Sequence, residues 1–144
     1  MRTYNEGRHI GRLLEGVSRQ TLQDTEVIVV DSGSTDNTLD AALSHRVKVV
    51  RILPQDFTFG YSLNRGIAAA SADLIVIASA HVYPVYPDWL ERLLAPFANE
   101  EVGLTYGRQS GDARTKFAEG QVFERWFPTQ SQSRQYHPFC NNAN

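Results

Sequence analysis

The sequence predicts an α/β fold, with a mostly parallel sheet flanked by helices. Short continuous runs of β-branched and other apolar residues, typical of buried strands, alternate with segments in which apolar residues recur every three or four positions. The second pattern is typical of a helix with one buried face. Strands that alternate with helices are joined by crossovers, and crossovers favour parallel pairing.

The first helix is expected within residues 6–19, where Ile10, Leu13, Leu14 and Val17 form one apolar stripe. The remaining expected elements are strand 26–31, helix 39–43, strand 47–53, helix 61–70, strand 74–81, a helix that starts at Pro87, and strand 102–106. The run 74–81 reads Leu-Ile-Val-Ile-Ala-Ser-Ala-His, and we expect a strand that is buried on both faces.

Composition is that of an ordinary soluble domain. The 144 residues are 42% hydrophobic with a net charge of -2, which suits one domain with a core. The 14 basic residues are outnumbered by 16 acidic ones, which argues against a nucleic-acid partner. The single Cys140 excludes an internal disulfide and fits a reducing compartment. There is no apolar run of the roughly 20 residues that a membrane span needs, and no signal-peptide core, so we expect a cytoplasmic protein.

Both ends of the chain look cut. It opens with loop-like residues where an α/β domain usually opens with a strand, and it stops at Asn144 without a helix or strand terminator. We therefore expect a fragment, or the product of a truncated gene, of a larger domain. Residues 109–144 are polar and less periodic, although Val122, Phe123 and Trp126 can share one helical face.

Polar side chains follow each expected strand. Because the carboxyl ends of parallel strands meet at one edge of a sheet, residues 3–6, 31–36, 55–60 and 79–83 should form a polar crevice there. Each of these residues alone has a simpler explanation. Asp31 can cap a turn, and polar residues on the helix 61–70 can be solvated surface. The prediction depends on their convergence.

Four segments carry a family resemblance: Arg-Thr-Tyr-Asn-Glu at 2–6, Val-Val-Asp-Ser-Gly-Ser-Thr-Asp-Asn-Thr at 29–38, Leu-Asn-Arg-Gly-Ile-Ala at 63–68, and Pro-Asp-Trp-Leu-Glu at 87–91. In this order and spacing they resemble family 2 glycosyltransferases of the GT-A (Rossmann-like) fold. The resemblance covers most of residues 2–108. It implies that residues 1–108 form the nucleotide-sugar-binding half of a GT-A domain, that 109–144 begin the acceptor-side portion, and that the fold is incomplete at its C-terminal side.

The resemblance assigns roles at the nucleoside. Thr3 and Tyr4 match the segment that holds the nucleobase, with the tyrosine ring stacked on it, and Glu6 matches an acidic residue that faces the nucleoside. Asp31 matches the aspartate that reads the base, where a carboxylate accepts from the imide N–H. Many members have a second aspartate next, where this chain has Ser32, so base recognition is expected to differ.

The resemblance also locates the diphosphate. Asn64 and Arg65 match the helix that borders it, where a guanidinium suits phosphate oxygens. The family usually carries Asp-x-Asp at the end of strand 74–81, and this chain has Ser79-Ala80-His81 instead. We expect Ser79 to contact the donor and His81 to bind a divalent metal, Mn²⁺ or Mg²⁺, with imidazole favouring Mn²⁺. In two alternatives, His81 is a plain loop residue, or a protonated His81 neutralises phosphate directly.

The implied activity is transfer of a sugar, with inversion, from a nucleotide-diphosphate donor, expected to be a UDP-sugar, to a saccharide or other hydroxyl acceptor. The general base is expected beyond Asn144, and we therefore expect the chain alone to bind nucleotide without turnover. The segment 137–144 resembles the start of the acceptor side, where Asn142 and Asn144 are expected to bind sugar hydroxyls. The full-length protein is expected to associate peripherally with a membrane.

Two other functions compete with this interpretation. One is a non-catalytic nucleotide- or sugar-binding module, in which Ser79-Ala80-His81 marks a degenerate metal site. The other is an unrelated doubly wound protein, but the chain has neither a phosphate-loop nor a dinucleotide glycine fingerprint.

Overall fold

The computed structural model describes residues 1–112, 115–127 and 129. Two compact units divide the chain, Met1–Ala95 and a second that begins at Pro96. The boundary expected at residue 108, between donor and acceptor portions, stays a prediction. Cys140, Asn142 and Asn144 lie outside the described residues. Within the part of the chain that is described, no helix is long and apolar enough to cross a membrane.

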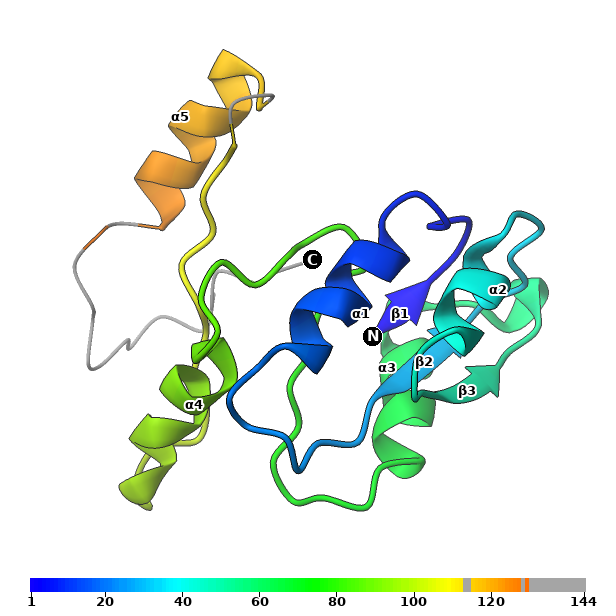
Figure 1. Cartoon of the computed structure of the whole chain (residues 1–144), viewed down its shortest axis with the longest axis horizontal. Helices are drawn as coiled ribbons and strands as arrows, with labels where there is room; N and C mark the ends of the chain where they lie inside the picture. Colours follow the sequence, from blue (N-terminus) through cyan, green and yellow to red (C-terminus); the bar gives the residue numbers. More distant parts are fainter. Residues whose placement is uncertain (113–114, 128, 130–144) are drawn as a thin grey trace. The chain divides into compact units, whose positions relative to one another are not determined.

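The first unit is built on a parallel sheet of three strands, which confirms the predicted class of fold (Figure 1). These are β1 (Arg2–Thr3), β2 (Ile28–Asp31) and β3 (Lys48–Arg51), in the order β1-β2-β3. Thr3 pairs with Asp31, and Asp31 pairs with Arg51. The N-terminal residues, which were expected to be loop, thus supply the short strand β1.

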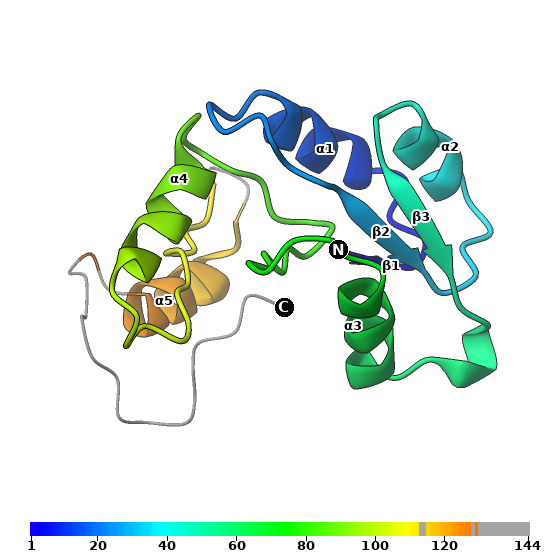
Figure 2. The same cartoon turned by 90° about the horizontal axis from the view of Figure 1, so that it is seen from below.

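Helices cover both faces of this sheet. Figure 2 shows α1 (Ile10–Ser18) and α2 (Thr38–Leu43) on one face and α3 (Phe59–Ala68) on the other. Between β3 and α3 lies the short 3-10 helix η1 (Pro54–Asp56). The other helices are α4 (Trp89–Leu94), η2 (Ala95–Ala98) and α5 (Phe117–Trp126). Helices α1 to α4 confirm the expected positions to within a few residues.

The core follows from the apolar stripe of α1. Ile10, Leu13 and Leu14 are buried, and Ile10 and Leu14 form one cluster with Val29 of β2 and Ala42 of α2. Full burial of one such aliphatic side chain contributes about 1.5–3 kcal/mol. The sequence pattern therefore placed the buried face of this helix correctly.

Residues 74–81 do not form the expected strand. Their single bridge is parallel, between Ser79 and Arg2. Residues 74–77 join no ladder with β1, β2 or β3. Leu74 is 47% exposed, Ile75 42% and Ile77 47%, so burial on both faces was wrong for this part of the run. An apolar run becomes a strand only where neighbouring strands and side chains receive it.

Residues 102–106 show the same effect. They were expected to be the last strand, and they have no regular secondary structure. No strand lies in the described part of the second unit, so their backbone has no ladder to join. The β-branched composition of this segment was therefore a poor guide without tertiary neighbours.

Candidate functional site

Several of the predicted site residues lie at the carboxyl edge of the sheet. Thr3 and Asp31 end β1 and β2 in direct register, and Ser79 reaches the same edge through its bridge to Arg2. Ligands of open α/β sheets bind at this kind of edge. The structure therefore brings together the first, second and fourth of the polar segments that were expected to converge.

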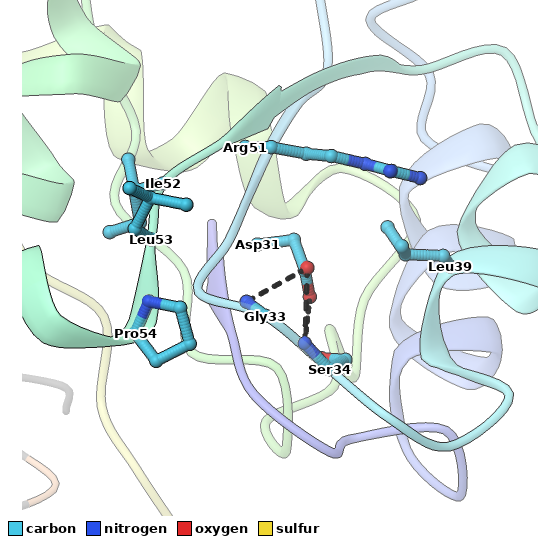
Figure 3. A pocket seen from close by; sticks show the side chains of 8 residues that line it. All are labelled: Asp31, Gly33, Ser34, Leu39, Arg51, Ile52, Leu53 and Pro54. Atoms are coloured by element: carbon cyan, nitrogen blue, oxygen red, sulfur yellow. Dashed lines mark hydrogen bonds between the residues drawn. The ribbon is translucent and has the colours of Figure 1, made fainter.

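Asp31 organises the turn that follows β2. It is buried, and its Oδ2 accepts hydrogen bonds from the backbone N–H of Gly33 and of Ser34, both at 3.1 Å (Figure 3). Gly33 has a φ of 91°, in the left-handed region that glycine adopts without a steric cost. Asp31 thus caps a turn, as the simpler explanation held. A carboxylate offers about four lone-pair sites, so it can still accept from a ligand.

A cavity of about 270 Å³ opens beside this carboxylate. Its walls come from the turn after β2, from α2 and from the end of β3 with the residues that follow (Figure 3). The lining residues are Asp31, Gly33, Ser34, Leu39, Arg51, Ile52, Leu53 and Pro54. Pockets for drug-sized ligands measure about 300–1,000 Å³, so this cavity suits one part of a nucleotide, such as a base.

Ser32 and Thr3 are joined at the sheet edge. Both the backbone N–H and the hydroxyl of Ser32 donate to the carbonyl oxygen of Thr3, at 3.1 and 3.2 Å. Both residues are buried, and Thr3 Oγ1 has no hydrogen-bond partner among the described residues. A buried hydroxyl without a partner is uncommon in a native protein, and this one keeps its full capacity to bond to a ligand.

Asn5 lies in the polar segment 3–6, but the sequence analysis gave it no role of its own. Its Oδ1 accepts from the backbone N–H of Thr35 at 2.8 Å, and its own N–H donates to Ser34 Oγ at 2.9 Å. Its φ is 54°, in the left-handed region that asparagine tolerates better than most residues. An asparagine just after a strand was the available signal. Asn5 fixes the loop after β1 to the turn after β2.

Glu6 and Asp36 extend this junction. The N–H of Glu6 donates to Thr38 Oγ1 at 2.8 Å, and the N–H of Gly7 donates to Asp36 Oδ2 at 3.1 Å. The Thr38 hydroxyl and backbone N–H donate to Asp36 Oδ1. These bonds, the hydroxyl first, hold the pKa of Asp36 below its usual range, against the opposing effect of desolvation.

Glu6 also faces the residues that replace the Asp-x-Asp motif. Its Oε1 lies 3.7 Å from His81 Nδ1. Ser79 Oγ lies 3.2 Å from His81 Nε2 and 3.4 Å from Nδ1. One carboxylate, one imidazole and one hydroxyl are therefore adjacent at the carboxyl edge.

The segment after His81 is fastened to α1. The Tyr83 hydroxyl lies 2.6 Å from His9 Nδ1, and the Arg12 guanidinium lies 4.0 Å from the Tyr83 ring centroid. Farther along, the buried Gln20 donates to the carbonyl oxygen of Tyr86 at 3.0 Å. These contacts hold the segment in place although it forms no strand.

Three other predicted residues are more exposed. Tyr4 is exposed, and so are Asn64 and Arg65 on α3. Among the described residues, none of the three lines the Asp31 cavity. Their roles at the nucleobase and the diphosphate stay predictions.

Residues 1–142 match the family model described as Glycosyl transferase family 2. The chain belongs to this family. It is 29% identical over 109 residues to the O-antigen chain rhamnosyltransferase WbaN of Salmonella anatum, covering 74% of this chain and 35% of that protein. It is 33% identical over 118 residues to validoxylamine A glucosyltransferase of Streptomyces hygroscopicus subsp. jinggangensis, covering 73% and 27%. The chain thus spans about a third of the length of such relatives.

Structural similarity agrees with the family. Glucosyl-3-phosphoglycerate synthase from Mycobacterium tuberculosis, crystallised with Mn²⁺, UDP and glucosyl-3-phosphoglycerate, matches with a TM-score of 0.57 and 28% identity. The match covers 67% of this chain and 37% of that one. The expected family and GT-A fold are confirmed, and the relatives are enzymes that transfer sugars.

The side chains of this family 2 chain could bind a metal ion through only a few protein ligands. Nowhere in the described ranges do three or more His, Cys, Asp or Glu side chains group so as to hold an ion. Glu6 and His81 nevertheless supply one oxygen and one nitrogen close together, a mixed set that suits Mn²⁺ better than Mg²⁺. The residues therefore fit an ion that takes its other ligands from a diphosphate and water.

Proposed function

We propose that this family 2 domain is the donor-binding part of an inverting glycosyltransferase that uses a nucleotide-diphosphate sugar, with UDP as the nucleotide. The observation that carries the proposal is the convergence of Thr3, Asp31 and Ser79 at one edge of the parallel sheet. Support for UDP comes from the similar synthase crystallised with UDP and Mn²⁺.

The base is proposed to enter the cavity beside Asp31. The free lone pairs of the Asp31 carboxylate accept the imide N–H of uracil. The unpartnered hydroxyl of Thr3, which pairs with Asp31 in the sheet but does not line the cavity, is proposed as a further polar contact to the nucleoside. Tyr4 is exposed and free to stack on the base. Ser32 already donates its hydroxyl to Thr3, so its contribution is to hold the two strand ends together.

The diphosphate is proposed to lie over Ser79 and His81, with Asn64 and Arg65 of α3 beside it. Arg65 offers a planar guanidinium that matches phosphate oxygens. His81 is the proposed metal ligand at this end of the donor. A divalent ion held here supplies positive charge that stabilises the departing diphosphate.

The chemical step follows from the donor. The bond between the anomeric carbon and the diphosphate oxygen breaks, and its electron pair leaves with the nucleoside diphosphate. The acceptor oxygen bonds to the opposite face of that carbon, which inverts the configuration, and its proton passes to a general base. We assign that base to none of residues 1–144. Relatives named for rhamnosyl and glucosyl transfer leave the sugar open.

Calorimetric titration of the chain with UDP, with and without Mn²⁺, tests the proposal. We expect UDP to bind, and Asp31→Asn to weaken its affinity by about 10-fold, since a hydrogen bond to a charged group contributes about 1.5–3 kcal/mol. The variant keeps one oxygen to accept from Gly33 and Ser34. Asp73→Asn, at an exposed position outside the cavity, is the matched control.

Two outcomes count against this function. A folded chain that binds no uridine nucleotide under either condition would exclude a UDP donor. UDP binding whose affinity changes neither with Mn²⁺ nor with His81→Ala would favour the non-catalytic module. The observation that supports this second function is that Ser79-Ala80-His81 contains no carboxylate.

A further inference from the structure

A carboxylate from a distant part of the sequence lies beside Ser79-Ala80-His81. In the family pattern, an Asp-x-Asp motif provides acidic oxygen at this place, and the present chain has Ser79-Ala80-His81. In the folded chain, Glu6 Oε1 lies 3.7 Å from His81 Nδ1. Glu6 belongs to the loop after β1, far from His81 in sequence.

Both side chains are partly exposed, and the backbone beside each of them is hydrogen-bonded. The Glu6 side chain is 26% exposed and the His81 side chain 52%. The Glu6 N–H is bonded to Thr38 Oγ1, and its carbonyl oxygen accepts from His9 and Ile10 at the start of α1, each at 2.9 Å. A pair on a fixed scaffold loses less freedom when it takes up a ligand.

The segment with His81 is also anchored. Ser79 is bridged to Arg2 of β1, and the carbonyl oxygen of Ser79 accepts from Val82 N–H at 3.2 Å. The Ser79 hydroxyl lies against the edge of the His81 ring that carries both nitrogens. It can bond to one nitrogen and leave the other for a metal, as partners of metal-binding histidines do.

We propose that Glu6 and His81 together form the protein half of the donor's metal site, with Glu6 replacing the acidic ligand that Ser79-Ala80-His81 lacks. Ligand distances near 2.1 Å allow two donors of one ion to lie up to about 4.2 Å apart, and 3.7 Å falls within that limit. This inference rests on the proposed function and extends it. The mixed oxygen and nitrogen set selects Mn²⁺ over Mg²⁺.

Electron paramagnetic resonance of free Mn²⁺, titrated against the chain with saturating UDP and a UDP-only blank, tests the proposal. Glu6→Gln and His81→Ala are each expected to weaken Mn²⁺ binding by about 10–100-fold, the size of effect that follows loss of metal-site partners. Glu6→Asp keeps a carboxylate and is expected to recover part of the affinity. A tenfold excess of Mg²⁺ should leave most of the Mn²⁺ bound.

Glu15→Gln is the matched control, because Glu15 is an exposed carboxylate on α1 that pairs with Arg19. It should leave Mn²⁺ binding unchanged. UDP binding in EDTA is measured for every variant, so that loss of the nucleotide is distinguished from loss of the metal. Equal Mn²⁺ affinity of Glu6→Gln and the unaltered chain, with circular dichroism unchanged, would overturn the proposal.

Other results separate this inference from the function it rests on. If Glu6→Gln loses UDP in EDTA as well, Glu6 contacts the nucleoside and the metal role is overturned. If the unaltered chain binds UDP but no Mn²⁺, the metal inference fails and the non-catalytic module is favoured, while the UDP site itself stands. If it binds no UDP under any condition, the proposed function fails first.

Discussion

Asn5 Oδ1 accepts a hydrogen bond from the backbone N–H of Thr35 at 2.8 Å and thereby joins the loops that follow β1 and β2. The same oxygen lies 3.4 Å from the N–H of Asp36. Asn5 adopts a φ of 54° to make these contacts. One side chain therefore fixes the loop after β1, which carries Tyr4 and Glu6, to the turn after β2, which Asp31 caps.

Replacing Asn5 tests this relationship. Asn5→Ala removes the acceptor and places a Cβ without a compensating bond at positive φ, so it should destabilise the fold by about 2–4 kcal/mol. Asn5→Gly removes the same acceptor but tolerates the backbone conformation. Urea denaturation should rank the unaltered chain above Asn5→Gly and that variant above Asn5→Ala. Equal stability of the two variants would show that the positive φ is not costly here.

Gly33 is held in a turn that no other residue fits well. Its φ is 91°, and a Cβ there would lie 2.6 Å from Cγ of Pro54, a clash between two residues that line the cavity beside Asp31. Gly33→Ala should therefore cost about 1–3 kcal/mol and weaken nucleotide binding. The matched control is Gly11→Ala in α1, where a Cβ meets nothing within 4 Å. That change should stabilise the helix by about 0.5–1 kcal/mol in the same denaturation measurement.

Gln20 ties the segment beyond His81 to α1. Its Nε2 donates to the carbonyl oxygens of Gly16 and Tyr86, and its Oε1 accepts from the buried N–H of Leu90 at 3.1 Å. Gln20→Ala removes all three bonds, although the Tyr86 carbonyl oxygen still accepts from the Trp89 N–H at 3.3 Å. The loss should cost about 1–3 kcal/mol for each group that stays dry and without a partner.

Hydrogen exchange provides the specific readout for Gln20. The Leu90 amide should lose protection in Gln20→Ala beyond the change in global stability. Gln55→Ala, at an exposed position in η1, should stay within about 0.5 kcal/mol of the unaltered chain. Unchanged protection of Leu90 would contradict this role for Gln20.

Asp36 should make stability depend on pH. Its pKa in the folded chain is lowered, chiefly by the Thr38 hydroxyl, relative to about 3.9 in an unfolded chain. Stability from this carboxylate is therefore complete above about pH 4 and is lost as the pH falls through the folded pKa. Thr38→Val removes the hydroxyl, so the free energy of unfolding should fall less steeply between pH 5 and pH 3.

Thr38→Ser keeps the hydroxyl and is the control for this pH dependence. It should retain the slope of the unaltered chain, even if the lost methyl group lowers stability at every pH. Chemical denaturation at half-unit pH intervals gives both curves. A Thr38→Val curve parallel to that of the unaltered chain would show that the Thr38 hydroxyl is not the cause of the pH dependence.

Local patterns in the sequence were sufficient for the elements that carry the core. Helix α1 and the strands β2 and β3 lie where apolar periodicity and β-branched runs predicted them. The convergence of polar residues at one edge also followed, because parallel strands point their carboxyl ends the same way. The four motifs together were enough to identify the family, which the family model confirmed.

Tertiary structure decided the rest. The run 74–81 has the composition of a buried strand, yet in the described part of the chain its strand-type pairing is limited to the bridge between Ser79 and Arg2. The contact of Glu6 with His81 and the bridge of Asn5 to Thr35 join residues distant in the chain. Periodicity determines which face of an element is buried. Distances between loops depend on strand register and on which neighbouring elements are present, so no local sequence pattern predicts these distances.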